Sequence, residues 1–304
     1  MAFVKRIFLF FVINALVVVT LSLVLNILNV RPYLTAYGID YKALMAFCLI
    51  WGMGGALISL ALSRQMAKWL MGVKIINENT ADADSHALVT LVHKLAREAK
   101  LPGMPQVGIY DSPDVNAFAT GPTKRRSLIA VSRGLLNKMS PAELEGVLAH
   151  EMSHIANGDM VTMTLLQGIV NAFVMFLARI LASIFSGMGR NRQQSNNSSS
   201  YLSYTLLVFL FEVVFMILGQ LVVAAYSRFR EFRADAGGAK LAGKQKMISA
   251  LESLLAQQKT KKAFEEKPAI AAFQISRPNR GGLLSLLATH PPLEKRIAKL
   301  RKNS

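Results

Sequence analysis

The chain has 304 residues, of which 52% are hydrophobic and only 17% are charged, and its formal net charge is +17. A soluble domain of this length usually carries about a quarter charged residues, so the composition excludes an ordinary water-soluble protein and indicates a membrane protein. The single cysteine, Cys48, excludes an intrachain disulfide and a cysteine-based metal site.

Four long apolar runs account for this composition, at residues 7–28, 43–63, 161–185 and 201–227. Each reaches the roughly 20 residues that a helix needs to cross about 30 Å of hydrocarbon. The first run lacks a small-residue cleavage site after a short apolar core, so we expect it to be retained. The sequence therefore predicts a mainly α, multi-pass membrane protein with four transmembrane helices.

The apolar runs divide the chain into four predicted parts. Residues 1–63 hold two N-terminal transmembrane helices, and residues 161–227 form a transmembrane hairpin with a polar, flexible connector at 187–200. Residues 64–160 and 228–304 form the two parts of one domain outside the hydrocarbon. Because the hairpin returns the chain to the side that it left, both parts must face the same side of the membrane.

Basic residues favour the cytosolic side for this domain. Lys5 and Arg6 precede the first span, and Arg228, Arg230 and Arg233 follow the fourth. Basic residues also occur in the opposite loops, which weakens this bias. After residue 227 the chain has 17 basic and 6 acidic residues. We expect this tail to face anionic lipid head groups and not nucleic acid, because no basic motif interleaved with aromatic residues is present.

Polar residues inside the hairpin predict contacts between its two helices. Counted from the connector, Arg179 and Glu212 lie at depths that differ by only about 3 Å at 1.5 Å per residue. We expect Arg179 to pair with Glu212, and Asn171 with Gln220. The alternative is that Arg179 reaches out to the membrane surface while Glu212 lines a wet cavity.

The part outside the membrane has an α+β pattern. Residues 85–101 have apolar residues at helical spacing and are followed by Pro102 and Gly103. Three segments rich in alternating apolar or β-branched residues then predict a small sheet of about three strands, at 106–110, 115–121 and 126–136. A helix is expected from residue 141, because Ser140 is a favoured N-cap, Pro141 suits the first helical position and Glu143 completes a capping box.

This helix carries the motif HEMSH. His150 and His154 lie one turn apart on the same face, where two imidazoles can bind one tetrahedral Zn²⁺. Glu151 can reach a water molecule at the metal without being a ligand, which suits a general base. The alternative is a pair of partly buried helical histidines with a solvated glutamate between them.

A catalytic zinc site needs a third ligand. Positions that would extend the helix motif with a third histidine hold Asn157 and Met160, so the ligand must come from elsewhere. Glu231, just beyond the fourth span, is the candidate, and Asp235 one turn later could hold a ligand histidine through its free ring N–H. The alternative for Glu231 is a partner for the arginines around it.

The segments HEMSH, SRFREFRADAGGA and THPPLEKRI together resemble the HtpX membrane zinc endopeptidases, which are relatives of the CAAX prenyl proteases. The resemblance covers nearly the whole chain and implies a gluzincin-type zinc protease domain. It implies that His150, His154 and Glu231 bind one Zn²⁺ per chain, that Glu151 is the general base and that Asp235 supports a ligand. It also implies quality control of membrane or misfolded proteins at the cytosolic face of the bacterial inner membrane.

Four further residues are candidates mainly through this resemblance. His290 is expected to donate to the developing oxyanion or to contact substrate, and Arg228 is a similar case. Asn116 and Ala117 are expected in a sheet-edge strand that binds an extended polypeptide. The alternatives are a structural or N-capping role for His290, a lipid head-group contact for Arg228 and a turn role for Asn116.

Polypeptides, especially membrane proteins, are the expected substrates, and other membrane quality-control proteases are candidate partners. An alternative function is a membrane scaffold or chaperone with a structural metal. A structural zinc would have four protein ligands, whereas the sequence offers three and leaves Glu151 without a ligand role. An intramembrane protease is less favoured, because HEMSH precedes the third span and does not lie inside it.

Overall fold

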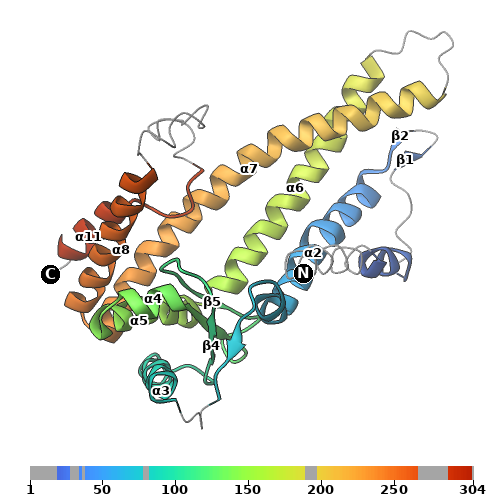
Figure 1. Cartoon of the computed structure of the whole chain (residues 1–304). Helices are drawn as coiled ribbons and strands as arrows, with labels where there is room; N and C mark the ends of the chain where they lie inside the picture. Colours follow the sequence, from blue (N-terminus) through green and yellow to red (C-terminus); the bar gives the residue numbers. More distant parts are fainter. Residues whose placement is uncertain are drawn as a thin grey trace. The chain divides into compact units, whose positions relative to one another are not determined.

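The computed structural model describes residues 19–27, 34–35, 38–77, 82–188, 197–265 and 287–302 (Figure 1). The helices are α2 (Tyr41–Leu70), α3 (Ala83–Glu98), α4 (Arg133–Lys138), α5 (Pro141–Asn157), α6 (Asp159–Met188), α7 (Asn197–Ala242), α8 (Lys244–Glu265) and α11 (Leu293–Lys302). The strands are β1 (Leu34–Thr35), β2 (Gly38–Ile39), β3 (Lys74–Ile75), β4 (Gln106–Tyr110), β5 (Ala117–Thr120) and β6 (Leu128–Ser132). The chain divides into two compact units, the first of Met1–Leu60 with Thr162–Val223 and the second of Ala61–Val161 with Ala224–Ser304.

Three helices among the described residues are long and apolar enough to cross a membrane, namely Tyr41–Leu70, Asp159–Ser186 and Leu202–Ala242. They coincide with three of the four predicted spans. The predicted span at 7–28 falls largely outside the described residues, and its described part, 19–27, is helical. The fourth crossing therefore stays a prediction.

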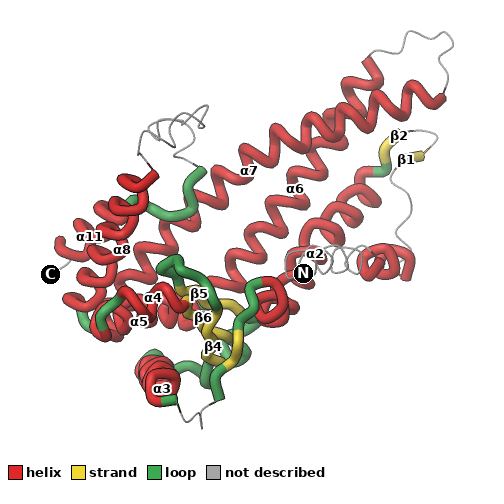
Figure 2. Tube along the Cα trace, in the orientation of Figure 1, coloured by secondary structure: helices red, strands yellow, loops and turns green. Residues whose placement is uncertain are grey.

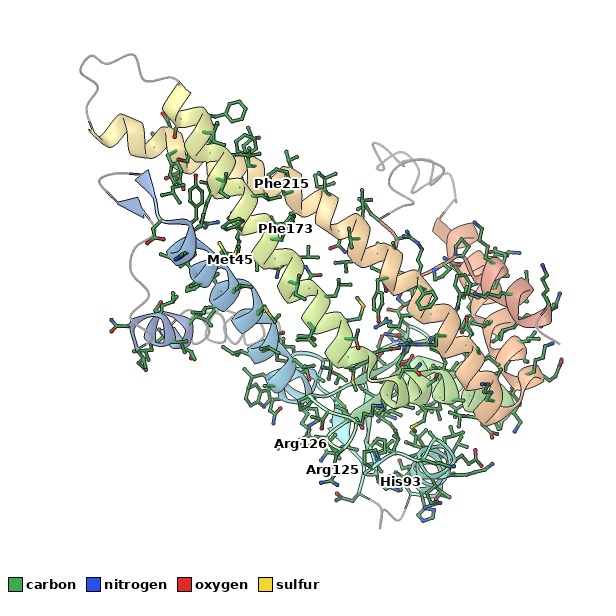
Figure 3. The ribbon with its side chains drawn as sticks, turned by 180° about the vertical axis from the view of Figure 1, so that it is seen from behind. Met45, His93, Arg125, Arg126, Phe173 and Phe215 are labelled. Carbon is green, nitrogen blue, oxygen red and sulfur yellow. The ribbon has the colours of Figure 1, made fainter. Side chains whose placement is uncertain are left out.

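Large apolar side chains remain exposed on these helices, as expected for surfaces that face lipid. Phe173 on α6, labelled in Figure 3, is 61% exposed, and Leu202 on α7 is 70% exposed. The predicted connector at 187–200 is shorter than expected, because α6 continues to Met188 and α7 begins at Asn197. Extending an existing helix costs little once its first turn has formed, and residues 189–196 lie outside the described part.

The predicted Arg179–Glu212 pair is confirmed in the first unit. Arg179 Nη1 donates to Glu212 Oε1 at 2.6 Å and to the carbonyl of Met175 at 3.0 Å. The prediction for Asn171 is wrong: it accepts a hydrogen bond from Gln167, one turn earlier on α6, at 2.8 Å. A neighbour at i−4 on the same helix satisfies the amide oxygen of Asn171 without a partner from another helix.

The second unit contains a four-stranded mixed sheet in the order β3-β4-β6-β5 (Figure 2). The strands β4, β5 and β6 fall where the sequence predicts them, and β3 extends the sheet at the other side. β4 and β6 are parallel, whereas β5 pairs antiparallel with β6 and is an edge strand. The predicted segment at 126–136 is a strand only to Ser132, whose side chain caps the short helix α4 that follows.

The core of the second unit forms between the sheet, α3 and α5. Val92 and Leu95 of α3, Ile129 of β6 and Leu148 and Met152 of α5 are all fully buried. The predicted capping box at Ser140 and Glu143 is present, so α5 begins at Pro141 as expected. This packing holds one face of α5 against the sheet and fixes the direction of its polar side chains.

Gly158 ends α5 in the left-handed conformation, with φ of 72°. A residue with a side chain would adopt this conformation only at a cost. The turn takes a single residue, because α6 begins at Asp159 immediately afterwards. The turn thereby brings the carboxylate of Asp159 to the ring of His154.

Candidate metal centre

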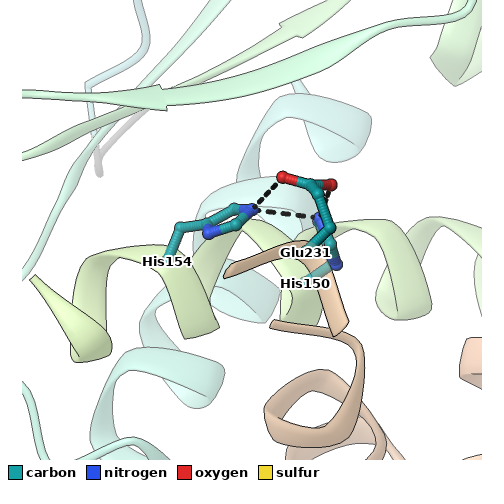
Figure 4. Close-up of side chains that lie close together, drawn as sticks. All are labelled: His150, His154 and Glu231. Atoms are coloured by element: carbon teal, nitrogen blue, oxygen red, sulfur yellow. Dashed lines mark hydrogen bonds and ion pairs between the residues drawn. The ribbon is translucent and has the colours of Figure 1, made fainter. Parts of the chain in front are cut away.

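His150 and His154 of α5 point their Nε2 atoms at one another across one helical turn (Figure 4). The two nitrogens are 3.1 Å apart, and the rings are nearly perpendicular, at 85°. Both residues are buried, with 7% of their surface exposed. Because each Nε2 can offer a lone pair to the same point, the two imidazoles can act together on one ion.

Glu231 of α7 completes the cluster and is fully buried. Its Oε1 lies 3.4 Å from His154 Nε2, and its Oε2 lies 3.5 Å from His150 Nε2. Ligand atoms on a tetrahedral Zn²⁺ at bond lengths near 2.05 Å are about 3.3 Å apart. The spacing of 3.1 Å between the two nitrogens, and of 3.4 and 3.5 Å from each nitrogen to one oxygen of Glu231, is of this size. With one ligand atom taken from each residue, the three atoms lie within 4.8 Å of one another, so the three residues could hold one ion.

A carboxylate supports each histidine on the side away from this cluster. His150 Nδ1 lies 3.0 Å from Asp235 Oδ1, and His154 Nδ1 lies 2.7 Å from Asp159 Oδ2. A carboxylate can only accept a hydrogen bond, so it favours the tautomer with the proton on Nδ1 and leaves Nε2 for a metal. At His150 the guanidinium of Arg296 also comes close, with Nη2 3.3 Å from Nδ1 and 3.4 Å from Nε2. The donor set and its orientation suit Zn²⁺.

The carboxylates also change the acidity of His150. Burial opposes a charged imidazole, but hydrogen bonds to Asp235 and Glu231 outweigh it and raise the pKa of His150 to about 9. Without a metal, the cluster therefore favours the protonated form of His150, because the two carboxylates stabilise a positive charge there. A bound metal has to displace that proton.

Arg296 of α11, to which no sequence motif assigned a role, contacts the same region. Its side chain is buried and makes two hydrogen bonds to Asp235, from Nε at 2.8 Å and from Nη2 at 2.6 Å. Its Nη1 lies 3.5 Å from Glu231 Oε2. The carboxylate raises the pKa of Arg296 against the effect of burial, so the guanidinium stays charged and fixes the direction of Asp235.

Glycines let α7 approach α5 closely enough for these contacts. A Cβ atom placed on Gly238 would lie 3.1 Å from the backbone nitrogen of His150 and 3.2 Å from its Cα. One on Gly237 would lie 2.1 Å from Ser153 Oγ. The pair GG in the segment RADAGGAK therefore brings Glu231 and Asp235 within reach of the histidines.

Glu151 faces the edge strand of the sheet. Its Oε2 accepts a hydrogen bond from the backbone N–H of Ala119 in β5 at 2.9 Å. Ala117 is the first residue of β5 and pairs with Val131. Asn116 precedes the strand, is exposed, and lines a cavity of about 830 Å³ with residues of α8. The contacts described for Asn116 and Ala117 do not include the three residues of the metal cluster.

His290 lies beside the cluster, with its Nδ1 2.9 Å from Glu231 Oε2 and its side chain 64% exposed. No hydrogen bond to Glu231 Oε2 has good geometry among the described residues, so this oxygen suits a cation. Arg228 does not touch the cluster in the contacts described; its Nη1 donates to the carbonyl of Ala288 at 2.8 Å. Arg228 thereby holds the chain two residues before His290.

The structure brings together five of the residues expected at the site, and adds two. His150, His154 and Glu231 form the cluster, Asp235 contacts His150 from behind, and His290 contacts Glu231. The additions are Asp159 and Arg296. Asp159 could have been found because it directly follows Gly158, which ends α5. Arg296 could have been found because it lies among apolar residues on one face of a helix that is otherwise mostly charged.

Comparison with known proteins gives consistent similarities. The sequence profile described as Peptidase family M48 matches residues 82–304. A Protease HtpX homolog of Bacillus subtilis (strain 168) is 50% identical over 303 residues, covering 97% of this chain and 98% of the relative. A Protease HtpX homolog of Methylacidiphilum infernorum is 48% identical over 302 residues, covering 98% of each.

Among solved structures, the crystal structure of S. mikatae Ste24p is similar, with a TM-score of 0.64 and 17% sequence identity. The match covers 98% of this chain and 65% of that one. At this identity the likeness shows a shared fold.

Proposed function

Because this chain belongs to Peptidase family M48 and is a membrane metalloprotease of the HtpX family, we propose that His150, His154 and Glu231 bind one catalytic Zn²⁺. The observation that carries this proposal is the distance of 3.1 Å between the two Nε2 atoms and of 3.4 to 3.5 Å from each of them to one oxygen of Glu231, with a carboxylate behind each histidine. Asp235 holds His150 in the tautomer that leaves Nε2 for the metal.

When bound, Zn²⁺ supplies Lewis acidity that polarises a peptide carbonyl and makes water a better nucleophile. Glu151 acts as the general base: its carboxylate takes a proton from the attacking water and passes it to the leaving amine. The hydrogen bond from Ala119 supports this role, because it directs the carboxylate towards the edge of the sheet where a peptide would lie.

The substrate is a polypeptide that binds in extended form along β5. An edge strand offers backbone hydrogen bonds that do not depend on the substrate's sequence, and β5 is at the end of the strand order. Asn116 and Ala117 lie at the start of this strand and guide the substrate. His290 stabilises the developing oxyanion or contacts the substrate, and Arg228 positions it by holding the carbonyl of Ala288.

The biological role that this site supports is the cleavage of membrane or misfolded proteins at the cytosolic face of the bacterial inner membrane. Apolar helices tether the domain to the membrane. The basic tail favours the cytosolic side, because anionic head groups attract it there and because basic residues are more frequent on that side. Other quality-control proteases of the same membrane are the partners that we propose.

The central test is Glu151→Gln in the full-length protein. We expect it to keep about one zinc per chain and to lose proteolysis by a factor of about 10² to 10⁴, the usual contribution of a general base. Zinc is measured by elemental analysis and cleavage with a labelled unfolded polypeptide. Glu143→Gln on the same helix is the matched control, since glutamine keeps the capping box and should leave both quantities unchanged.

A metal-bearing scaffold or chaperone is the competing function. It predicts undiminished substrate handling by Glu151→Gln and a fourth protein ligand on the metal. The cluster of described residues contains three ligand groups, which favours the peptidase. Wild-type cleavage by Glu151→Gln at full zinc content would contradict the catalytic assignment.

The cytosolic orientation has its own test. Lys302 of α11 is exposed, so Lys302→Cys in a Cys48→Ser background provides one accessible thiol in the second unit. A thiol reagent that does not cross membranes is expected to label it in inverted vesicles and not in intact spheroplasts. The reverse pattern would overturn the orientation.

A further inference from the structure

Asp159 is a fully buried carboxylate at the first position of α6, and both of its oxygens have partners. Oδ2 lies 2.7 Å from His154 Nδ1, and Oδ1 accepts a hydrogen bond from Arg233 Nη2. Burying a carboxylate costs several kcal/mol unless charged or hydrogen-bonding groups compensate for the lost water. Here an arginine compensates for the charge and an imidazole uses the second oxygen.

The two partners of Asp159 lie on two different helices. His154 precedes it by five residues on α5, across the left-handed turn at Gly158. Arg233 lies 74 residues later on α7, two residues after Glu231. One carboxylate thus joins the helix that supplies the two histidines to the helix that supplies the glutamate.

A simple structural explanation for Asp159 exists. An acidic residue in the first turn of a helix interacts favourably with the helix dipole. That effect requires neither full burial nor a direct hydrogen bond to an imidazole, and it gives no reason for Arg233 to reach the same carboxylate. The two directed contacts indicate that the carboxylate is held in place to orient the histidine ring.

We propose that Asp159 and Arg233 form a clasp that sets the metal affinity of the cluster by holding His154. Asp159 keeps the proton of His154 on Nδ1, so that Nε2 faces His150 and Glu231, and Arg233 fixes the position of Asp159. Both are positioning residues. This inference rests on the proposed metal site and adds a residue pair that acts through His154.

The experiment measures zinc affinity of the full-length protein by competition with a chromogenic chelator, and the absorption spectrum of the Co²⁺-loaded protein. Loss of a carboxylate behind a ligand histidine typically weakens metal binding 10- to 100-fold, and we expect this for Asp159→Ala. Asp159→Asn keeps an acceptor oxygen and should weaken binding less. Arg233→Gln should weaken zinc binding in the wild-type background and have no further effect in the Asp159→Ala background, because it acts through Asp159.

Asp82→Ala is the matched control. Asp82 caps the N-terminus of α3 and accepts a hydrogen bond from the Ser85 backbone at 3.2 Å. Its removal should lower the melting temperature and leave the zinc dissociation constant and the Co²⁺ spectrum unchanged. If Asp159→Ala misfolds, the smaller change Asp159→Asn carries the same comparison.

The outcomes separate this inference from the proposed function. A wild-type protein that binds no zinc would overturn the metal site itself. A wild-type protein that binds zinc, with an unchanged dissociation constant in Asp159→Ala, would overturn only the clasp. Additive effects of Asp159→Ala and Arg233→Gln would also contradict it, since they would mean that Arg233 acts independently of the carboxylate.

Discussion

The close approach of α7 to α5 can be tested at Gly238. In Gly238→Ala the new Cβ would lie 2.9 Å from Met247 Sδ, 3.1 Å from the His150 backbone nitrogen and 3.2 Å from His150 Cα. The methionine can move, but the α5 backbone cannot, so α7 must shift by a few tenths of an ångström. Overpacking of this kind costs about 1–3 kcal/mol, and alanine regains about 1 kcal/mol of helix propensity, so we expect a net loss of about 1 kcal/mol.

The same shift carries Glu231 and Asp235 away from the histidines. Metal sites tolerate deviations of about 0.2 Å in ligand distances, so we expect zinc affinity to fall about tenfold, equivalent to roughly 1.4 kcal/mol. The assay is zinc competition with a chelator, alongside thermal unfolding. Gly55→Ala is the control, because a Cβ there meets nothing within 4 Å. Unchanged zinc affinity and stability in Gly238→Ala would refute the account of the glycine pair.

Two further predictions concern charged pairs. Burial opposes ionisation of Glu145, but the hydrogen bond from Lys246 and the charge of Lys94 outweigh it and hold the pKa of Glu145 below its usual value. Such a group stabilises the fold above its unfolded-state pKa, near 4.3, and the contribution is lost as pH falls through the lower folded-state pKa. Glu145→Gln should therefore lower the free energy of unfolding by about 0.5–1 kcal/mol at neutral pH. Its melting curves should converge with those of wild type once the pH falls below the folded-state pKa of Glu145; a gap that persists in acid would contradict the pairing. For Arg179 and Glu212, a double-mutant cycle to alanine, measured by unfolding in mixed micelles, should give a coupling energy of about 1 kcal/mol. A protein with cysteine at both positions should form a crosslink. Zero coupling and no crosslink would show that this contact does not hold the two helices together.

Local rules predicted the elements around the site well. The start of α5 follows from Ser140, Pro141 and Glu143, whose interactions lie within four residues of one another. β4 and β5 follow from their alternating apolar residues. The segment at 126–136 was only partly right, because apolar spacing does not distinguish the end of a strand from the first turn of a helix such as α4. Ser132, which caps α4, was the available signal.

The metal cluster was predictable because its ligands can be found from short distances along the sequence. His150 and His154 are one turn apart on a helix that the sequence predicts, and Glu231 follows from the return of the hairpin to the same side. Asp159 and Arg296 were not predicted, because each has a partner far away in the chain, Arg233 at 74 residues and Asp235 at 61 residues. The contact of Asp159 with His154 depends in addition on the turn at Gly158. The Asn171 contact failed for a related reason, since depth alone does not distinguish a partner across the hairpin from one on the same helix.

The arginines after the fourth span show how one charge can serve two purposes. The sequence counts Arg228, Arg230 and Arg233 towards a cytosolic orientation, yet all three are engaged inside the second unit. Arg228 donates to Ala288, Arg230 lies 3.1 Å from Glu231, and Arg233 binds Asp159. An arginine committed to a buried carboxylate would be kept on either side of the membrane, so it is weak evidence for orientation. Removing these three and the buried Arg296 from the 17 basic residues after position 227 leaves 13 against 6 acidic residues. The positive-inside bias depends on basic residues close to a span, so the labelling of Lys302→Cys is the direct test of orientation.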